Sequence, residues 1–204
     1  MESYTEKLIK GRIAEVLAER LLRELGFFVL PFGKEHTAAP IIDMKSFIRA
    51  CGGKFEFDKS AKDSTTAKET LDHSPDLIAV HSSGRTELIE VKYRQSGYLV
   101  EEAKTFFKLY PGAVLLVINL EMIRDFVEPK TPADKQFVAN LRKTRFHIWR
   151  HDEPKIGTTA DKVTNPVPLS QWLIEEFKCD TVQVEQKVKE YESYVTKWFP
   201  RTVK

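Results

Sequence analysis

The first clear pattern along the chain is a helical spacing of apolar residues over 5–25. The apolar positions recur every three or four residues, which is typical of an amphipathic helix; they are Leu8, Ile9, Ile13, Val16, Leu17, Leu21, Leu22 and Leu25. Gly26 stands where such a helix is expected to end. The apolar residues 27–30 then predict a short strand that stops at Pro31.

Two segments rich in aliphatic and β-branched residues follow later, at 74–80 and 88–92. Both are short and bounded by turn-forming residues, which is typical of paired strands. Between them, the Ser-Ser-Gly sequence at 82–84 suits a three-residue hairpin loop that ends in a left-handed glycine. The sequence therefore predicts a hairpin in which His81 faces Arg85.

This hairpin register brings three charged side chains to one face. Counting back from the turn puts Asp76 opposite Glu90, and the two-residue period of a strand adds Lys92 to the same face. Within 77–80 and 88–91 the other residues on both faces are apolar, with Ile78, Val80 and Leu88 beside the charges and Leu77, Ala79, Ile89 and Val91 on the opposite face. Such a strand pair belongs inside a sheet that is covered above and below.

The two opposed carboxylates make this face a candidate metal site. Charges inside a sheet are costly unless they are paired or bound to a metal. Asp76 and Glu90 repel each other, and their hard oxygen ligands favour Mg²⁺ or Mn²⁺. The structural alternative is that Asp76 starts a strand after Pro75, while Glu90 pairs with Lys92 at a rim.

After the hairpin the pattern alternates between helix and strand. Residues 100–110 have a helical pattern that Pro111 and Gly112 stop, and 113–118 is the most apolar run of the chain, typical of a central buried strand. The order through residue 120 is thus helix, three strands, helix, strand. A helix between the third and fourth strands predicts that these two strands are parallel.

The remaining segments are less regular. Residues 34–73 show no firm pattern and lead directly into Pro75, so we expect their end beside the site as a lid, a substrate-selecting loop or a spacer. Further on, we expect a helix, a strand, a loop and two closing helices, over 133–143, 146–149, 154–168, 169–177 and 182–199. This predicts a core over 1–150 and a C-terminal helical extension over 151–204 that packs on it.

Composition sets limits on function. A chain of 204 residues can bury a sizeable core, and its net charge of +2 does not mark a nucleic-acid binder, so such a role has to come from local clusters. No apolar run approaches the length of a membrane span, and the amino terminus lacks a signal-peptide pattern. Cys51 and Cys179 have neither metal-ligand nor disulfide-framework spacing. We therefore expect no membrane partner and a reducing, cytoplasmic setting.

The first helix carries a second candidate carboxylate. Glu15 and Glu19 lie one turn apart on its polar side, and Gly11 lies one turn before Glu15. A glycine destabilises a helix by about 1 kcal/mol, which indicates that something approaches the backbone closely there. For Glu15 taken alone, the simpler interpretation is a carboxylate that solvates the helix face.

Glu15 on the first helix, Pro75-Asp76 on one strand and Glu90-Val91-Lys92 on the next resemble the PD-(D/E)xK nuclease superfamily. Residues 11–15 and 25–27 are most similar to its archaeal-type Holliday junction resolvase and Mrr-like branches. The resemblance implies an α/β fold of the restriction-endonuclease-like type. That fold has an αβββαβ core, with a mixed central sheet flanked by helices, and C-terminal helices are added here. The insert before Pro75 and the long C-terminal extension depart from the family pattern.

The resemblance implies a metal-dependent endonuclease that hydrolyses DNA phosphodiester bonds with a water activated by Mg²⁺, for which Mn²⁺ can substitute. Asp76, Glu90 and the carbonyl of Val91 would hold the ion. Glu15 would complete its ligands, directly or through a water, or hold a second ion. Lys92 would orient the attacking water or stabilise the transition state, in a protonation state that the sequence leaves open.

The implied partner is DNA, either branched or duplex. Lys10, Arg12 and Arg94 are expected near the site, where each would contact a phosphate or stay a solvated rim charge. Cutting both strands of a duplex usually calls for two symmetry-related sites, so a homodimer through the C-terminal helices is a further expectation. The alternative functions are a catalytically inactive nuclease-fold module that binds nucleic acid or protein, and a purely structural protein.

Overall fold

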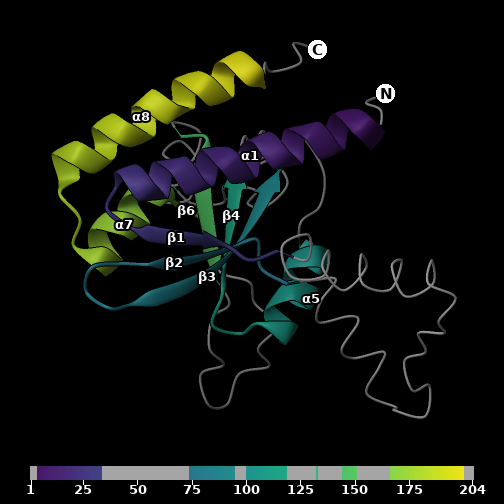
Figure 1. The fold of residues 1–204 in the computed structure, drawn as a ribbon, viewed down its shortest axis with the longest axis horizontal. Coiled ribbons are helices and arrows are strands. Elements are labelled where there is room, and N and C mark those ends of the chain that lie inside the picture. The colour runs from purple at the N-terminus through teal and green to yellow at the C-terminus, as the bar shows by residue number, and fades with distance from the viewer. Residues whose placement is uncertain are drawn as a thin grey trace, which may run out of the picture.

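The computed structural model describes residues 4–33, 74–94, 100–118, 132, 144–150 and 166–199. The predicted insert over 34–73 and the predicted helix over 133–143 lie outside this part. The described part is an α/β fold in which helices flank a six-stranded sheet (Figure 1). None of its helices combines the length and the apolar character needed to cross a membrane.

The strands lie side by side in the order in which they occur along the chain: β1 (Phe28–Pro31), β2 (Leu77–Val80), β3 (Thr86–Tyr93), β4 (Val114–Ile118), β5 (Phe146–Arg150) and β6 (Val167–Pro168). Neighbours are antiparallel except β3 and β4, which are parallel and joined through α5 (Val100–Leu109). The predicted αβββαβ order and the mixed sheet are confirmed. The loop predicted over 154–168 is wrong at its end, because Val167 and Pro168 pair with β5.

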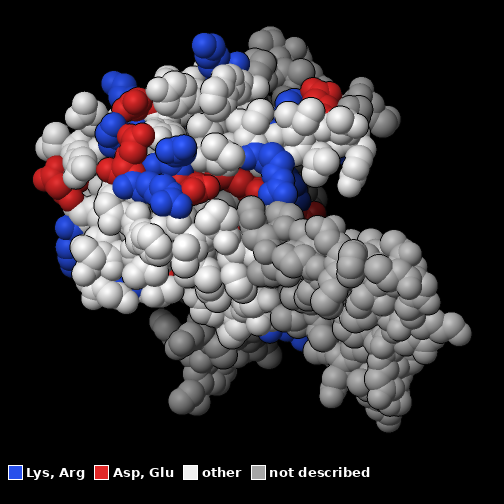
Figure 2. Space-filling view, viewed as in Figure 1, with Lys and Arg blue, Asp and Glu red and all other residues white. Residues whose placement is uncertain are grey.

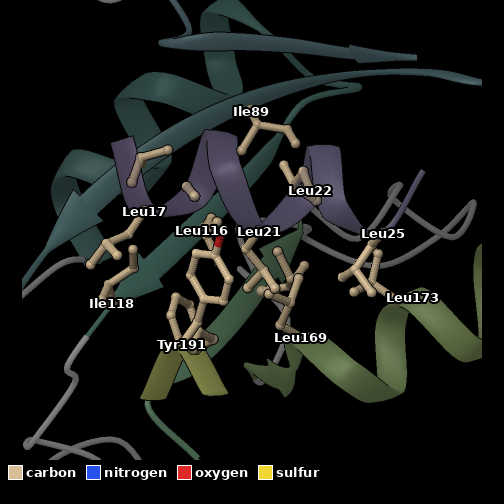
Figure 3. Close-up of a cluster of buried hydrophobic side chains, with 14 of the residues drawn as sticks. Leu17, Leu21, Leu22, Leu25, Ile89, Leu116, Ile118, Leu169, Leu173 and Tyr191 are labelled. Carbon is tan, nitrogen blue, oxygen red and sulfur yellow. The ribbon is translucent and has the colours of Figure 1, made fainter. Parts of the chain in front are cut away.

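One face of the sheet is covered by α1 (Tyr4–Glu24), α7 (Leu169–Phe177) and α8 (Thr181–Trp198). Their buried side chains form a single cluster with the sheet. Figure 3 shows part of this cluster, in which residues of α1 and of the sheet meet residues of α7 and α8: Leu17, Leu21, Leu22, Leu25, Ile89, Leu116, Ile118, Leu169, Leu173 and Tyr191. The C-terminal helices therefore complete the main core.

The opposite face carries a smaller cluster beneath α5. Its buried members come from α5, the turn after it, β4 and β5: Ala103, Phe106, Phe107, Ala113, Leu115, Val117 and Trp149. Leu88 of β3 packs against this cluster and is partly buried. Ile78 and Val80 on the same face of β2 are also only partly buried, so the hairpin is covered less completely than its apolar pattern predicted.

Some apolar residues that the sequence pattern assigned to the buried faces of α1 and α8 are exposed. Leu8, Ile9 and Val16 of α1 are 54–55% exposed, and Trp198 of α8 is 46% exposed. The first turns of α1 extend past the sheet (Figure 1), so apolar side chains there have no core beneath them. Val16 lies on the outer side of the helix, away from the buried Ala14 and Ala18, as the rotation of 100° per residue requires.

The outer edge of β1 offers fewer free backbone groups than an ordinary strand edge. Phe32 donates its N–H to the carbonyl of Asp76. Backbone groups alternate in direction along a strand, so those of Val29 and Pro31 point away from β2, toward the outer edge. The guanidinium of Arg23 donates to the Val29 carbonyl, and Pro31 has no N–H to offer. A covered acceptor and a missing donor are known devices that prevent edge-to-edge aggregation.

Candidate active site

The hairpin has the register that its sequence predicts. The N–H of His81 binds the carbonyl of Arg85 at 2.9 Å, and Gly84 has a φ of +83°. Continuing the β2–β3 pairing by one residue beyond Leu77 places Asp76 opposite Glu90. Hydrogen-bonded and non-hydrogen-bonded pairs alternate along antiparallel strands, and Asp76–Glu90 is of the second kind, in which the side chains lie closer together.

The β2–β3 pairing ends at Leu77 and Ile89, one residue before this position. The next residue pair would be Pro75 with Val91, but proline has no N–H to donate to the Val91 carbonyl. Instead, the N–H of Val91 binds the Asp76 carboxylate at 2.7 Å. Since the N–H and C=O of one strand residue point to the same neighbouring strand, the Val91 carbonyl faces the side on which this carboxylate lies.

The environment of Asp76 is unfavourable to its negative charge. Burial first, and then the charge of Glu90, raise the pKa of Asp76 to about 8. The charge of Glu15 adds to this increase, whereas the hydrogen bond from Val91 and the charge of Lys92 oppose it. At pH 7 the carboxyl group is therefore mostly protonated, and a nearby cation would restore its ionised form.

Lys92 compensates the second carboxylate. Its ammonium group donates a hydrogen bond to Glu90, which is only 7% exposed. Burial alone would lower the pKa of Lys92, but the charge and hydrogen bond of Glu90 and the charge of Asp76 outweigh it, and the pKa is raised. Lys92 is therefore charged at neutral pH. Glu90 thus pairs with Lys92, as the purely structural interpretation of the sequence expected. The Glu90 carboxylate is buried, however, and does not lie at a solvated rim.

Glu15 lies close to this site without joining a compact ligand cluster. Its side chain is 23% exposed and accepts a hydrogen bond of 2.6 Å from Arg12, while its charge acts on Asp76. In the described part of the chain, no three His, Cys, Asp or Glu side chains are grouped so that they could hold a metal ion. Direct ligation of a metal ion by Glu15, as the resemblance implied, is therefore not supported.

The three cations expected to contact phosphates are each engaged with a carboxylate: Lys10 with Glu6, Arg12 with Glu15 and Arg94 with Glu102. Figure 2 agrees, because it shows basic and acidic side chains alternating near α1 and no continuous basic surface in that view. Exposed ion pairs contribute about 0–1 kcal/mol each, so a phosphate could replace these carboxylates at little cost.

Tyr110 is a site neighbour that the sequence pattern did not reveal. It packs at the edge of the cluster beneath α5, and its pKa is raised by burial and then by the charge of Glu90. The sequence pattern predicted only that Tyr110 ends a helix. The proximity depends on the β3–β4 register, in which Leu115 lies beside Glu90. The residues around Tyr110 in the sequence do not indicate that register.

Comparison with known proteins does not place the chain in a family. No protein-family model, no curated protein and no solved structure matches it. The groups that bear on function are Asp76, Glu90 and Lys92 with their surroundings.

Proposed function

We propose that the protein is a metal-dependent endonuclease that hydrolyses DNA phosphodiester bonds. The observation that carries this proposal is the opposition of two carboxylates, Asp76 and Glu90, with the charged Lys92 bound to one of them. Ionising both carboxyl groups in this half-buried location is unfavourable, and burial and the charge of Glu90 accordingly raise the pKa of Asp76. A bound cation would compensate the charges of Asp76 and Glu90, and an anionic phosphate would compensate that of Lys92.

The donor set suits Mg²⁺ or Mn²⁺. Asp76, Glu90 and the carbonyl of Val91 supply only oxygen, and Mg²⁺ usually binds a few protein oxygens while keeping several waters. When bound, the ion would neutralise phosphate charge and make a coordinated water more acidic. Proton loss from Asp76 has to accompany binding, because its pKa of about 8 leaves it protonated at neutral pH.

The protein's own groups have distinct roles in this proposal. Lys92 keeps its charge and stabilises the negative charge that develops on the phosphate during attack. Glu90 holds Lys92 in place before substrate arrives. Glu15, oriented by Arg12, acts on the site through its charge and through water.

The second candidate is a nuclease-fold module that binds a partner without cleaving it. One observation favours it: the resting site is balanced without any ion, because Asp76 holds a proton and Glu90 is paired with Lys92. Calorimetry with Mn²⁺ separates the two candidates. An active site requires Mn²⁺ binding that Glu90→Gln abolishes, whereas a non-catalytic module predicts no binding that depends on Glu90.

Cleavage assays test the proposed activity directly. Supercoiled plasmid, linear duplex, branched DNA and single strands would be incubated with the protein and Mg²⁺ or Mn²⁺. We expect cleavage of at least one substrate, its loss in Asp76→Asn, and its retention in Glu185→Gln, which changes an exposed carboxylate on α8. Cleavage that survives Asp76→Asn would rule out the proposed site.

A further inference from the structure

One face of α1 leads from its free N-terminal turns to the candidate site. Lys7, Gly11 and Glu15 are spaced four residues apart, and residues at this spacing lie above one another on one side of a helix. The charge of Glu15 acts on Asp76, so this line of residues ends near the proposed site. Its other end lies on the turns of α1 that extend past the sheet in Figure 1.

Gly11 lies on this line where internal packing does not require a glycine. Seven residues later, Ala18 faces the same way and is fully buried, as is Ala14, so those small side chains allow α1 to pack closely on the sheet. Gly11 is only partly buried, and a Cβ added there would meet nothing within 4 Å. Glycine is nevertheless one of the least favourable residues in a helix interior. Among the described residues, nothing fills the space beside Gly11.

Lys7 differs from the other cations near the site. Lys10, on a neighbouring side of the helix, pairs with Glu6 at 3.1 Å. Lys7 is exposed, and within the described residues it forms no hydrogen bond or ion pair. A flexible, unpaired ammonium group one turn before an open glycine is well placed to bind a phosphate group.

We propose that Lys7 and Gly11 form the entry track for one phosphodiester strand of the substrate. The strand's backbone passes over Gly11, and Lys7 binds a phosphate about two turns of the helix away from Glu15. This inference rests on the proposed nuclease function and deepens it, because it identifies the sugar-phosphate backbone as what α1 recognises. Contacts of this kind carry no base information, so recognition along α1 is independent of sequence.

The test compares DNA affinities of full-length variants that all carry Asp76→Asn, so that the DNA stays intact. Fluorescence anisotropy with labelled duplex and single strands would be measured over a range of salt concentrations. Gly11→Ala should raise the midpoint of thermal unfolding and yet weaken DNA binding by at least about fivefold. Lys7→Gln should weaken binding and reduce the slope of log K against log salt by about one.

Two controls match these substitutions. Lys189→Gln removes an exposed lysine of α8, and Gln186→Ala adds helix propensity at an exposed position of the same helix. Neither control should change DNA affinity. Suppose that wild type cleaves DNA and the Asp76→Asn parent binds it: unchanged affinity in Gly11→Ala, or an unchanged salt slope in Lys7→Gln, then overturns the entry track alone. If wild type does not cleave DNA and the Asp76→Asn parent does not bind it, the proposed function is overturned together with the entry track.

Discussion

The Asp76 carboxylate binds the backbone N–H of Val91 at 2.7 Å, where the β2–β3 pairing ends. Pro75 cannot continue the ladder beyond this point, because it lacks an N–H. The side chain of Asp76 thus takes the place of a backbone carbonyl as the partner of Val91. The Asp76 side chain therefore lies at the end of the strand pairing, next to the backbone of Val91.

Asp76→Asn should stabilise the metal-free protein at alkaline pH. The folded state raises the pKa of Asp76 from 3.8 to about 8, so between these values it binds more protons than the unfolded state. The free energy of unfolding therefore falls as pH rises through this window, by about 1.4 kcal/mol for each unit by which the folded-state pKa exceeds the unfolded-state pKa. Asparagine keeps an acceptor for the Val91 N–H and does not titrate.

Urea denaturation of wild type and Asp76→Asn from about pH 5 to about pH 9, without divalent ions, measures this effect. The stability difference in favour of the variant should grow with pH. A constant difference across the range would show that the folded state does not raise the pKa of Asp76.

The Glu90–Lys92 pair should be strongly coupled. Lys92→Met leaves the buried Glu90 carboxylate without its compensating charge, which we expect to destabilise the protein by about 1–3 kcal/mol. This is below the cost of a fully buried pair, because the Lys92 side chain is 33% exposed. Adding Glu90→Gln should recover much of the loss.

A double-mutant cycle in urea provides the coupling energy of this pair. The matched control is the exposed pair of Arg12 and Glu15, for which the cycle should return less than about 1 kcal/mol. Simple additivity of the Lys92→Met and Glu90→Gln effects would contradict the interaction described above.

Arg23→Ala should expose the edge of β1. The substitution removes the donor to the Val29 carbonyl and the ion pair of 2.9 Å with Glu19. We expect a loss of about 1–2 kcal/mol in the free energy of unfolding and faster aggregation, because the outward acceptor becomes free to bind another chain. Light scattering during incubation near the unfolding midpoint measures this, with the exposed Arg20→Ala as control. Equal aggregation of both variants would exclude a protective role for Arg23.

Leu173→Ala should destabilise the whole described fold. Leu173 of α7 is fully buried in the cluster that α1 and the sheet share, and such truncations typically cost about 2–5 kcal/mol. Circular dichroism and tryptophan fluorescence should report one coincident transition at a lower midpoint. The exposed Val182→Ala is the control and should change little. Two separate transitions would mean that the C-terminal helices fold independently of the core.

Much of the fold was predictable from the sequence, because the signals that specify it are local. Side-chain alternation and the Ser-Ser-Gly turn set the hairpin register, so the opposition of Asp76 and Glu90 follows from counting residues. Helical periodicity predicted α1, α5, α7 and α8 to within one or two residues at their ends. The apolar run before residue 119 predicted strand β4, and the helix between β3 and β4 predicted that these two strands are parallel.

Only the tertiary structure decided the surroundings of these elements. The raised pKa values of Asp76 and Lys92, the pairing of Arg12 with Glu15 and the approach of Tyr110 all combine charges and burial from separate elements. The exposure of Leu8 and the pairing of β6 depend likewise on where the sheet ends and what lies beside it. Burial and electrostatic fields are sums over residues distant in the chain, so no local pattern contains them.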